Sequence, residues 1–175
     1  VHPLRNKIPI YLGAEGPKNI ALSTEIADGW LPLFYNPYDE SVYASSLTNT
    51  KPDFQIAQMV TVNITDDIDA GLLGVKHFLS LYIGGMGAKG TNFHKNLFER
   101  MGYADEAEQI QKLFFEGKRD EAARVIPDDL ADAMALVGPV DRIRDRLQAW
   151  RDSRVTTMLV TASDVESLRA ISEIW

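Results

Sequence analysis

The chain has 175 residues, of which 45% are hydrophobic, and a formal net charge of −7, a balance that suits one globular domain. Its acidity and the lack of a basic stripe argue against a protein that binds nucleic acid through the phosphates. With no cysteine and three scattered histidines, it has neither a disulfide framework nor a spaced zinc motif. We therefore expect a cytoplasmic enzyme without a bound metal.

The sequence has no segment typical of membrane insertion or export. Its apolar runs are far shorter than the roughly 18–20 residues of a membrane helix, and its first residues lack the charged-then-apolar order of a signal peptide. We expect no membrane partner. The chain begins with Val1 instead of methionine, from which we expect processing or truncation, and His2 is expected to lie in a frayed start.

Strands and helices alternate through the first half of the chain. Residues 8–12 are an apolar run of strand length that ends at Gly13. Gly16 is the expected N-cap of a helix that starts with Pro17 and stops at Gly29. The same order then repeats twice, with a strand at 30–34, a helix at 36–47, a strand at 54–64, and a helix at 68–82 that Asp66 is expected to cap.

The second half begins with a helical insertion over residues 84–137. Gly138 then opens a helix with apolar residues on one face through Trp150, residues 155–161 form a strand, and Ser163-x-x-Glu166 is a capping box that starts the last helix. Four strands alternating with helices predict an α/β fold with a parallel sheet. Because a closed (β/α)8 barrel typically needs about 250 residues, the chain is either a small open sheet or half a barrel.

Parallel strands would bring four turns to one edge of the sheet. These turns lie at residues 13–16, 34–36, 63–66 and 161–163. The carboxyl edge is where α/β proteins bind ligands, so we expect the functional site there. Asn63 and Thr65, at the end of the third predicted strand, could face the barrel mouth, since alternate strand residues point inward.

The first of these turns has two interpretations. Free N–H groups at a helix N-terminus favour an anion, Gly16 allows a ligand to approach the backbone, and Lys18 adds a positive charge. Alternatively, Gly13 and Gly16 only turn the chain and cap the helix. A phosphate-binding Walker loop is excluded, because its glycine and lysine spacing is not met.

A second glycine cluster at residues 85–90 satisfies the pattern G-x-G-x-x-G. It follows a predicted helix instead of a strand, so the context of a dinucleotide-binding turn is missing. The cluster either stops the helix or forms a mobile cover over the site. We favour the cover, because glycines permit the backbone changes that such lids need.

Two ionisable residues are the candidate catalytic groups. His94, just beyond the glycine cluster, is either a proton donor to a substrate or a solvated residue in the first turn of a short helix. Glu15 is either a general acid beside the 13–16 turn or a carboxylate that faces water. His77 lies off the apolar stripe of its helix and is expected at the surface.

Five blocks of the sequence, taken in order, resemble a known family. The blocks are IPIYLGAEGPKNIALSTEIADGWLPLFY, MVTVNITDD, FLSLYIGGMGAKGTNFH, EAARVIPDDLADAMALVGPVDRIRDRL and VTTMLVTA. Together they resemble the carboxyl-terminal half of luciferase-like monooxygenases, most closely the actinobacterial F420-dependent oxidoreductase branch. The resemblance covers essentially the whole chain. It implies a (β/α)8 TIM barrel with an insertion before its last strand, of which this chain supplies strands five to eight.

The resemblance also implies an activity and a set of cofactor contacts. The whole protein would transfer a hydride between coenzyme F420 and a small-molecule organic substrate. An FMN-dependent monooxygenase and a non-catalytic half-barrel are the alternatives. The open sheet edges favour a homo-oligomer or association with the missing N-terminal half. By this resemblance the cofactor contacts Gly13, Ala14, Glu15, Gly16, Lys18, Leu33 and Phe34. Some relatives place phosphate ligands after the second strand, where this chain has Leu33 and Asn36.

Overall fold

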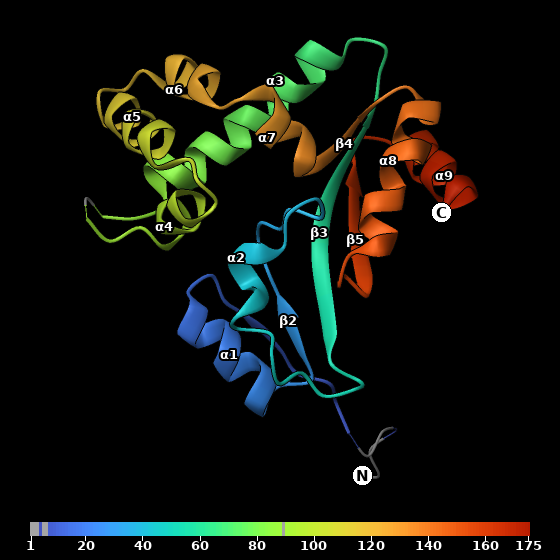
Figure 1. Cartoon of the computed structure of the whole chain (residues 1–175). Coiled ribbons are helices and arrows are strands. Elements are labelled where there is room, and N and C mark those ends of the chain that lie inside the picture. Colours follow the sequence, from blue (N-terminus) through green and yellow to red (C-terminus); the bar gives the residue numbers. More distant parts are fainter. Residues whose placement is uncertain (1–3, 5–6, 89) are drawn as a thin grey trace.

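The computed structural model describes residues 4, 7–88 and 90–175, so His2 lies outside the described residues. Its sheet is parallel throughout, and β1, β2, β3 and β4 follow one another in that order. The strands are β1 (Tyr11–Gly13), β2 (Gly29–Leu31), β3 (Gln55–Ile64), β4 (Ala135–Gly138) and β5 (Thr157–Ala162) (Figure 1). The parallel α/β architecture is confirmed. The expected number of four strands is wrong, because the described chain contains five.

The long strand β3 is the centre of the sheet and has a gap along one edge. Thr61 and Val62 pair with both β4 and β5, so these two strands lie on opposite edges of β3. On the edge away from β5, β2 pairs only with Gln55 and Ile56, and β4 begins only at Thr61 (Figure 1). In the described chain, residues 57–60 therefore have no strand beside them on that edge.

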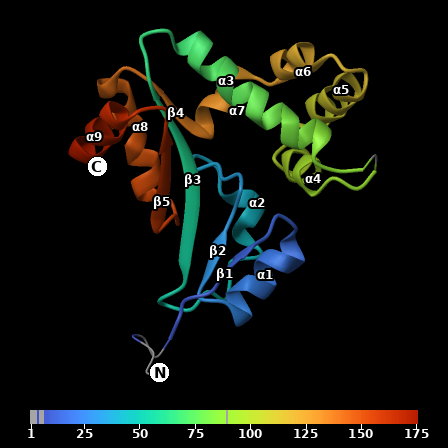
Figure 2. The same cartoon turned by 180° about the vertical axis from the view of Figure 1, so that it is seen from behind.

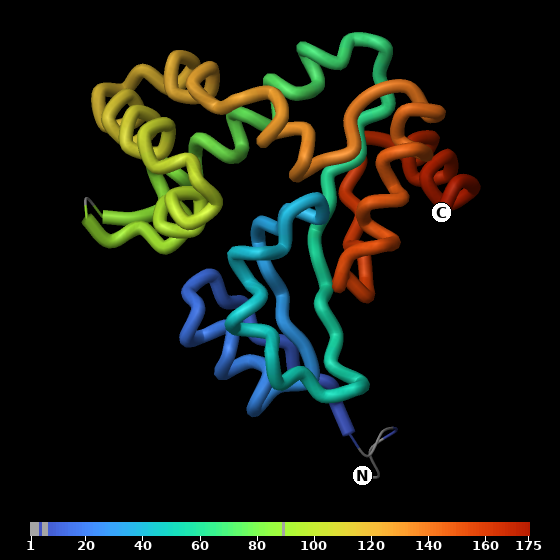
Figure 3. The backbone as a smooth tube through the Cα atoms, in the orientation of Figure 1, coloured from blue at the N-terminus to red at the C-terminus, as the bar shows by residue number. Residues whose placement is uncertain are grey.

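The helices form two groups around the sheet. They are α1 (Pro17–Ile26), α2 (Ser41–Ala44), α3 (Ile68–Ser80), the π-helix η1 (Leu81–Gly85), α4 (Phe93–Arg100), α5 (Ala104–Phe115), α6 (Arg119–Val125), α7 (Asp128–Ala133), α8 (Val140–Asp152) and α9 (Val165–Ile174). Helices α3 to α6 project to one side of β3, whereas α8 and α9 lie on the other, as both cartoon views and the backbone tube show (Figures 1, 2 and 3). Among the described residues, no helix is both long and apolar enough to span a membrane.

Two helices follow the predicted signals closely. Helix α1 starts at Pro17 directly after its N-cap Gly16, because proline lacks the N–H that this position leaves unpaired. Helix α8 buries Ile143, Leu147 and Trp150 on one face, as the spacing of these residues predicts. Both predictions are confirmed.

The first two strands differ from their predicted bounds. The run at 8–12 is not a buried strand, since Ile8 and Ile10 are 77% and 61% exposed and pairing begins only at Tyr11. The second strand ends at Leu31 instead of residue 34. Beyond it the backbone bonds to side chains in place of a strand: the N–H of Leu33 donates to Glu15, and its carbonyl accepts from Gln58.

The helix predicted over residues 36–47 is reduced to the single turn α2. Before it, Asn36 accepts a hydrogen bond from the N–H of Tyr38 at 2.9 Å, and Asp39 accepts one from the N–H of Ser41 at 3.0 Å. Such Asx turns give the backbone an alternative to helical hydrogen bonds. They explain why the helix does not start at Asn36-Pro37.

The strand β4 lies mostly within the stretch that was expected to be helical. All four of its residues are buried, with β3 on one side and α3, α7 and α8 packed around it. A short apolar run that is buried on both faces has no alternation, so its periodicity does not distinguish a strand from a helix. The chain leaves β4 at Gly138, where the backbone φ is 128°. Glycine adopts this conformation readily, whereas residues with a Cβ rarely do. The last predicted strand, 155–161, is shifted to Thr157–Ala162.

The caps of α3 and α9 are each one residue away from their predicted positions. Asp67, not Asp66, caps α3 and accepts a hydrogen bond from the N–H of Ala70 at 3.0 Å. In the last helix the cap is Asp164, whose carboxylate accepts from the N–H of Ser167 at 2.7 Å, so the Ser163 capping box is wrong.

Replacing Asp67 with alanine should destabilise the chain by about 1 kcal/mol, the usual cost of losing an N-cap acceptor. The matched control is Asp66→Ala, which removes the neighbouring carboxylate but no cap. Urea unfolding followed by circular dichroism measures both variants. Equal losses for the two variants would contradict this assignment of the cap.

Candidate functional site

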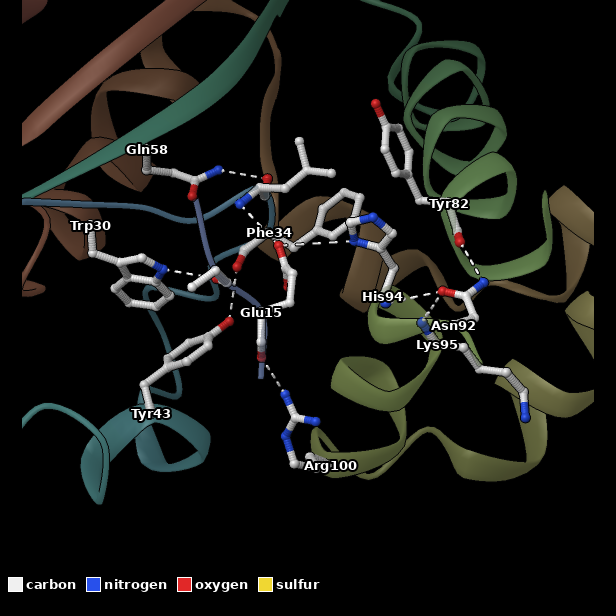
Figure 4. Close-up of polar contacts among 12 residues, drawn as sticks. Glu15, Trp30, Phe34, Tyr43, Gln58, Tyr82, Asn92, His94, Lys95 and Arg100 are labelled. Atoms are coloured by element: carbon white, nitrogen blue, oxygen red, sulfur yellow. Dashed lines mark hydrogen bonds and ion pairs between the residues drawn. The ribbon is translucent and has the colours of Figure 1, made fainter. Parts of the chain in front are cut away.

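The turn at residues 13–16 is held in place by side chains from two distant elements. The indole Nε1 of Trp30, on β2, donates to the carbonyl of Ala14 at 2.8 Å. From the opposite side, Nη2 of Arg100, at the end of α4, donates to the carbonyl of Glu15 at 2.7 Å (Figure 4). The helical insertion is thereby joined to the carboxyl edge of the sheet at this turn.

The carboxyl group of Glu15 is buried against this edge. Its side chain is 11% exposed, and its Oε1 accepts a hydrogen bond from the N–H of Leu33 at 3.1 Å. Burial raises the pKa of Glu15 to about 7, although the Leu33 N–H and the charge of Arg100 favour the ionised form and oppose the rise. The interpretation of Glu15 as a turn carboxylate that faces water is therefore wrong.

His94 is placed by an asparagine that joins two helices. Asn92 is the N-cap of α4, and its Oδ1 accepts hydrogen bonds from the N–H groups of His94 and Lys95 at 3.0 Å. Its Nδ2 donates to the carbonyls of Tyr82 and Ile83 in η1, at 2.9 and 2.8 Å. Asn92 thus satisfies both helix ends at once and fixes the backbone that carries His94 (Figure 4).

The imidazole of His94 faces Glu15 from a largely apolar setting. Its ring makes edge contacts with Phe34 and Tyr82, with centroids 5.8 and 5.0 Å apart. Its Nδ1 is buried, has no hydrogen-bond partner among the described residues, and lies 3.9 Å from Oε1 of Glu15 (Figure 4). Burial lowers the pKa of His94. His94 is in the first turn of a helix, as predicted, but it is not a solvated residue.

A pocket of about 330 Å³ opens beside this pair. Its walls are Gly13, Ala14, Glu15, Gly16, Asn19, Leu31, Leu33, Phe93 and His94. A Cβ added at Gly16 would meet no described atom within 4 Å. Packing therefore does not require glycine at this position, and the absence of a side chain leaves open space beside the backbone. The structure thus brings both candidate catalytic residues and five of the seven expected cofactor contacts into one pocket.

Lys18 and Phe34 lie outside this first pocket. Lys18 lines another depression, together with Thr24 and Lys51. Phe34 is 3% exposed, and it separates the His94 ring from a second, larger pocket that it also lines. His77 is at the surface, with 43% of its side chain exposed, as predicted.

The second pocket has a volume of about 480 Å³ and lies beside the carboxyl-terminal half of β3, the amino end of β4 and the carboxyl end of β5. Its walls are Leu33, Phe34, Tyr35, Gln58, Met59, Thr61, Val62, Asn63, Gly71, Gly74, Val75, Phe78, Leu79, Met134, Ala135, Thr161, Ala162 and Ser163. Asn63 faces this space, as expected, whereas Thr65 does not line it. No group of three potential metal-ligating side chains occurs in the described part of the chain.

The glycine cluster at 85–90 follows the π-helix η1 and not a strand, so it is not a dinucleotide-binding turn. It leads directly into Asn92, the cap of the helix that carries His94. Its role as a mobile cover remains a prediction.

Sequence analysis missed three residues that shape the site, namely Trp30, Gln58 and Arg100. A signal for Gln58 was present: in the predicted strand it shares its face with Ile56, Val60 and Val62, all buried, and a polar residue on a core face requires a partner. Trp30 and Arg100 act on a turn that is distant in the sequence, so no local pattern could reveal them.

Comparison with known proteins shows what the chain is similar to. Residues 1–157 match the luciferase-like monooxygenase family. The chain is 46% identical to a Mycobacterium tuberculosis protein provisionally named a coenzyme F420-dependent oxidoreductase, over 99% of this chain and 52% of the relative. It is 26% identical to the 5,10-methylenetetrahydromethanopterin reductase of Methanopyrus kandleri, over 87% of this chain and 44% of that enzyme.

Solved structures show the same fold. The coenzyme F420-dependent tetrahydromethanopterin reductase from Methanopyrus kandleri superposes with a TM-score of 0.68 at 22% identity, over 95% of this chain and 49% of the other. An F420-dependent secondary alcohol dehydrogenase superposes with a TM-score of 0.64 at 10% identity, over 97% and 48%. The expected fold, part of a luciferase-like TIM barrel, is confirmed. The chain spans about half the length of the curated relatives it matches.

Proposed function

The chain belongs to the luciferase-like monooxygenase family, and we propose its activity on that basis. We propose that it is part of an oxidoreductase that transfers a hydride between coenzyme F420 and a small organic molecule. The names of the Mycobacterium tuberculosis relative and of the two solved structures support F420 as the cofactor. The observation that carries the proposal is the buried Glu15, held beside His94 in a pocket at the carboxyl edge of the sheet.

The first pocket fits a cofactor in two respects. The open space at Gly16 allows a ligand to lie against the backbone. The buried, unpartnered Nδ1 of His94 can accept a hydrogen bond from a ligand or a water molecule. We propose that the 13–16 turn and Leu33 hold the cofactor. When bound, F420 would supply the carbon that accepts or donates the hydride.

The proposed role of Glu15 and His94 is to hold and transfer a proton. With a pKa of about 7, Glu15 is protonated in about half of the molecules at neutral pH, which suits a general acid or base. His94 has a lowered pKa and is neutral at that pH, so its Nδ1 can accept a proton from Glu15. At 3.9 Å the two atoms are beyond hydrogen-bond distance, so transfer needs one water molecule or a small side-chain movement.

We propose that the partner of this chain is the first half of the barrel. On the face of β3 and β5 opposite to the buried Val60, Met59 lies in register with Leu159, and they are 41% and 43% exposed. Apolar side chains at the centre of a sheet normally pack against another layer. The interior of a completed barrel would cover both of them.

Binding titrations with F420 and with FMN test the proposed cofactor. They use this chain and a fusion in which the first half of the Mycobacterium tuberculosis relative precedes it. We expect the fusion to bind F420 more tightly than FMN, and Gly16→Val to weaken F420 binding by filling the open space. Ala21→Val is the matched control, because Ala21 is an exposed position of the helix that Gly16 caps and lies outside the pocket. Preference for FMN would favour a monooxygenase, and binding of neither would favour a non-catalytic half-barrel.

A further inference from the structure

Gln58, which lines the second pocket, has a buried side-chain oxygen with no hydrogen-bond partner among the described residues. We infer that this pocket binds the apolar ring of a neutral substrate that donates one N–H or O–H hydrogen bond to the side-chain oxygen of Gln58. The inference rests on the proposed function, because it names the class of substrate that the oxidoreductase would take. Nothing in the sequence pattern or in the names of the relatives specifies this contact.

Two carbonyl groups determine the orientation of the Gln58 amide. Its Nε2 donates to the carbonyl of Leu33 at 3.0 Å (Figure 4) and to the carbonyl of Met59 at 2.7 Å. Carbonyls only accept hydrogen bonds, so the nitrogen and not the oxygen must face them. These bonds lie at the gap in the β3 edge between β2 and β4, where the amide takes the place of a neighbouring strand.

The opposite side of the same amide is left without a hydrogen bond. Gln58 is 2% exposed, and in the described part of the chain its Oε1 has no hydrogen-bond partner. A buried acceptor in this state carries a free-energy penalty. Gln58 lines the second pocket, but its Oε1 has no free surface, so a ligand in the pocket reaches it only after a small side-chain movement. A hydrogen bond donated to Oε1 would then remove the penalty and make binding specific for a donor.

The other walls of the pocket define the rest of the ligand. None of the described residues that line it is charged, so an ionised ligand would be desolvated without compensation. The rings of Phe34 and Phe78 form part of the apolar wall. Gly71 and Gly74, one turn apart on α3, present no side chain to the space. The volume of about 480 Å³ is in the range of small-molecule sites.

A matched pair of probes tests the hydrogen bond without any mutation. Indole and 1-methylindole have the same ring, but only indole has an N–H donor. Both are titrated into the ¹⁵N-labelled chain, and amide shifts around the second pocket are followed by NMR. We expect indole to bind about tenfold more tightly, the effect of one hydrogen bond to a buried acceptor, and to shift the Gln58 side-chain amide. Equal affinities would overturn the inference.

A variant that fills the pocket tests the location. An added Cβ at Gly74 would meet no atom within 4 Å, so Gly74→Leu should fold and should abolish binding of both probes. The control is Ala70→Leu, which places the same side chain on an exposed position of α3 outside the pocket. Unchanged binding in Gly74→Leu would overturn the inference. These titrations contain no F420, so a failure of the proposed cofactor site is seen separately.

Discussion

At pH 8 the Glu15→Gln variant should be more stable than the wild-type chain by about 3 kcal/mol. Burial raises the pKa of Glu15 from 4.5 to about 7, and each pKa unit corresponds to about 1.4 kcal/mol. The folded chain therefore holds a proton that the unfolded chain releases, and the wild type loses stability as the pH rises from about 4.5 to about 7. The amide of glutamine never ionises, yet it can still accept from the N–H of Leu33.

Urea unfolding at pH 5 and pH 8, followed by tryptophan fluorescence, measures this difference. We expect the two chains to differ little at pH 5, where Glu15 is protonated in the folded state. Glu25→Gln is the matched control, because it makes the same chemical change at an exposed carboxylate on α1. A Glu15→Gln variant that is no more stable than wild type at pH 8 would show that Glu15 is not desolvated.

Replacing Trp30 with alanine should destabilise the chain by about 4 kcal/mol. Trp30 is 1% exposed and makes edge contacts with Tyr35 and Tyr43, at centroid distances of 6.0 and 5.3 Å. Removing a large buried aromatic side chain costs about 3–5 kcal/mol. The change also leaves the carbonyl of Ala14 without its donor, so the turn that carries Glu15 should lose its fixed position.

Circular dichroism during urea unfolding measures the loss, with Trp175→Ala as the control. Trp175 is 58% exposed at the end of the chain, so its loss should change stability by no more than about 0.5 kcal/mol. The conservative variant Trp30→Phe keeps much of the packing but not the hydrogen bond, and should fall between the two. Equal unfolding midpoints for the alanine variants would contradict the role of Trp30 in the core.

Much of the fold could be predicted from the sequence, because its signals are local. The start of α1 depends on Gly16 and Pro17, and the buried face of α8 on the spacing of Ile143 and Trp150. Local signals failed where other forces decide the structure. Beyond β2, the backbone N–H of Leu33 bonds to a side chain instead of a neighbouring strand, so the strand ends early. All four residues of β4 are buried, so they show no alternation of polar and apolar residues by which a strand could be predicted.

The site was predicted less completely than the fold, for a physical reason. Glu15 and His94 could each be named as candidates from their places beside a turn and a glycine cluster. Burial raises the pKa of Glu15, whereas the N–H of Leu33 and the charge of Arg100, 85 positions away, oppose the rise. No pattern of neighbouring residues contains this information, so the raised pKa of Glu15 became evident only from the structure.

The most direct test of the account is the pKa of Glu15 with and without F420. Carboxyl ¹³C NMR of the fusion with the upstream half of the barrel gives this value, and Glu15→Gln identifies the resonance. If the cofactor lies against the 13–16 turn, the pKa should be about 7 in the free protein and should change when F420 binds. A pKa close to the ordinary value of 4.5, unaffected by F420, would contradict the account.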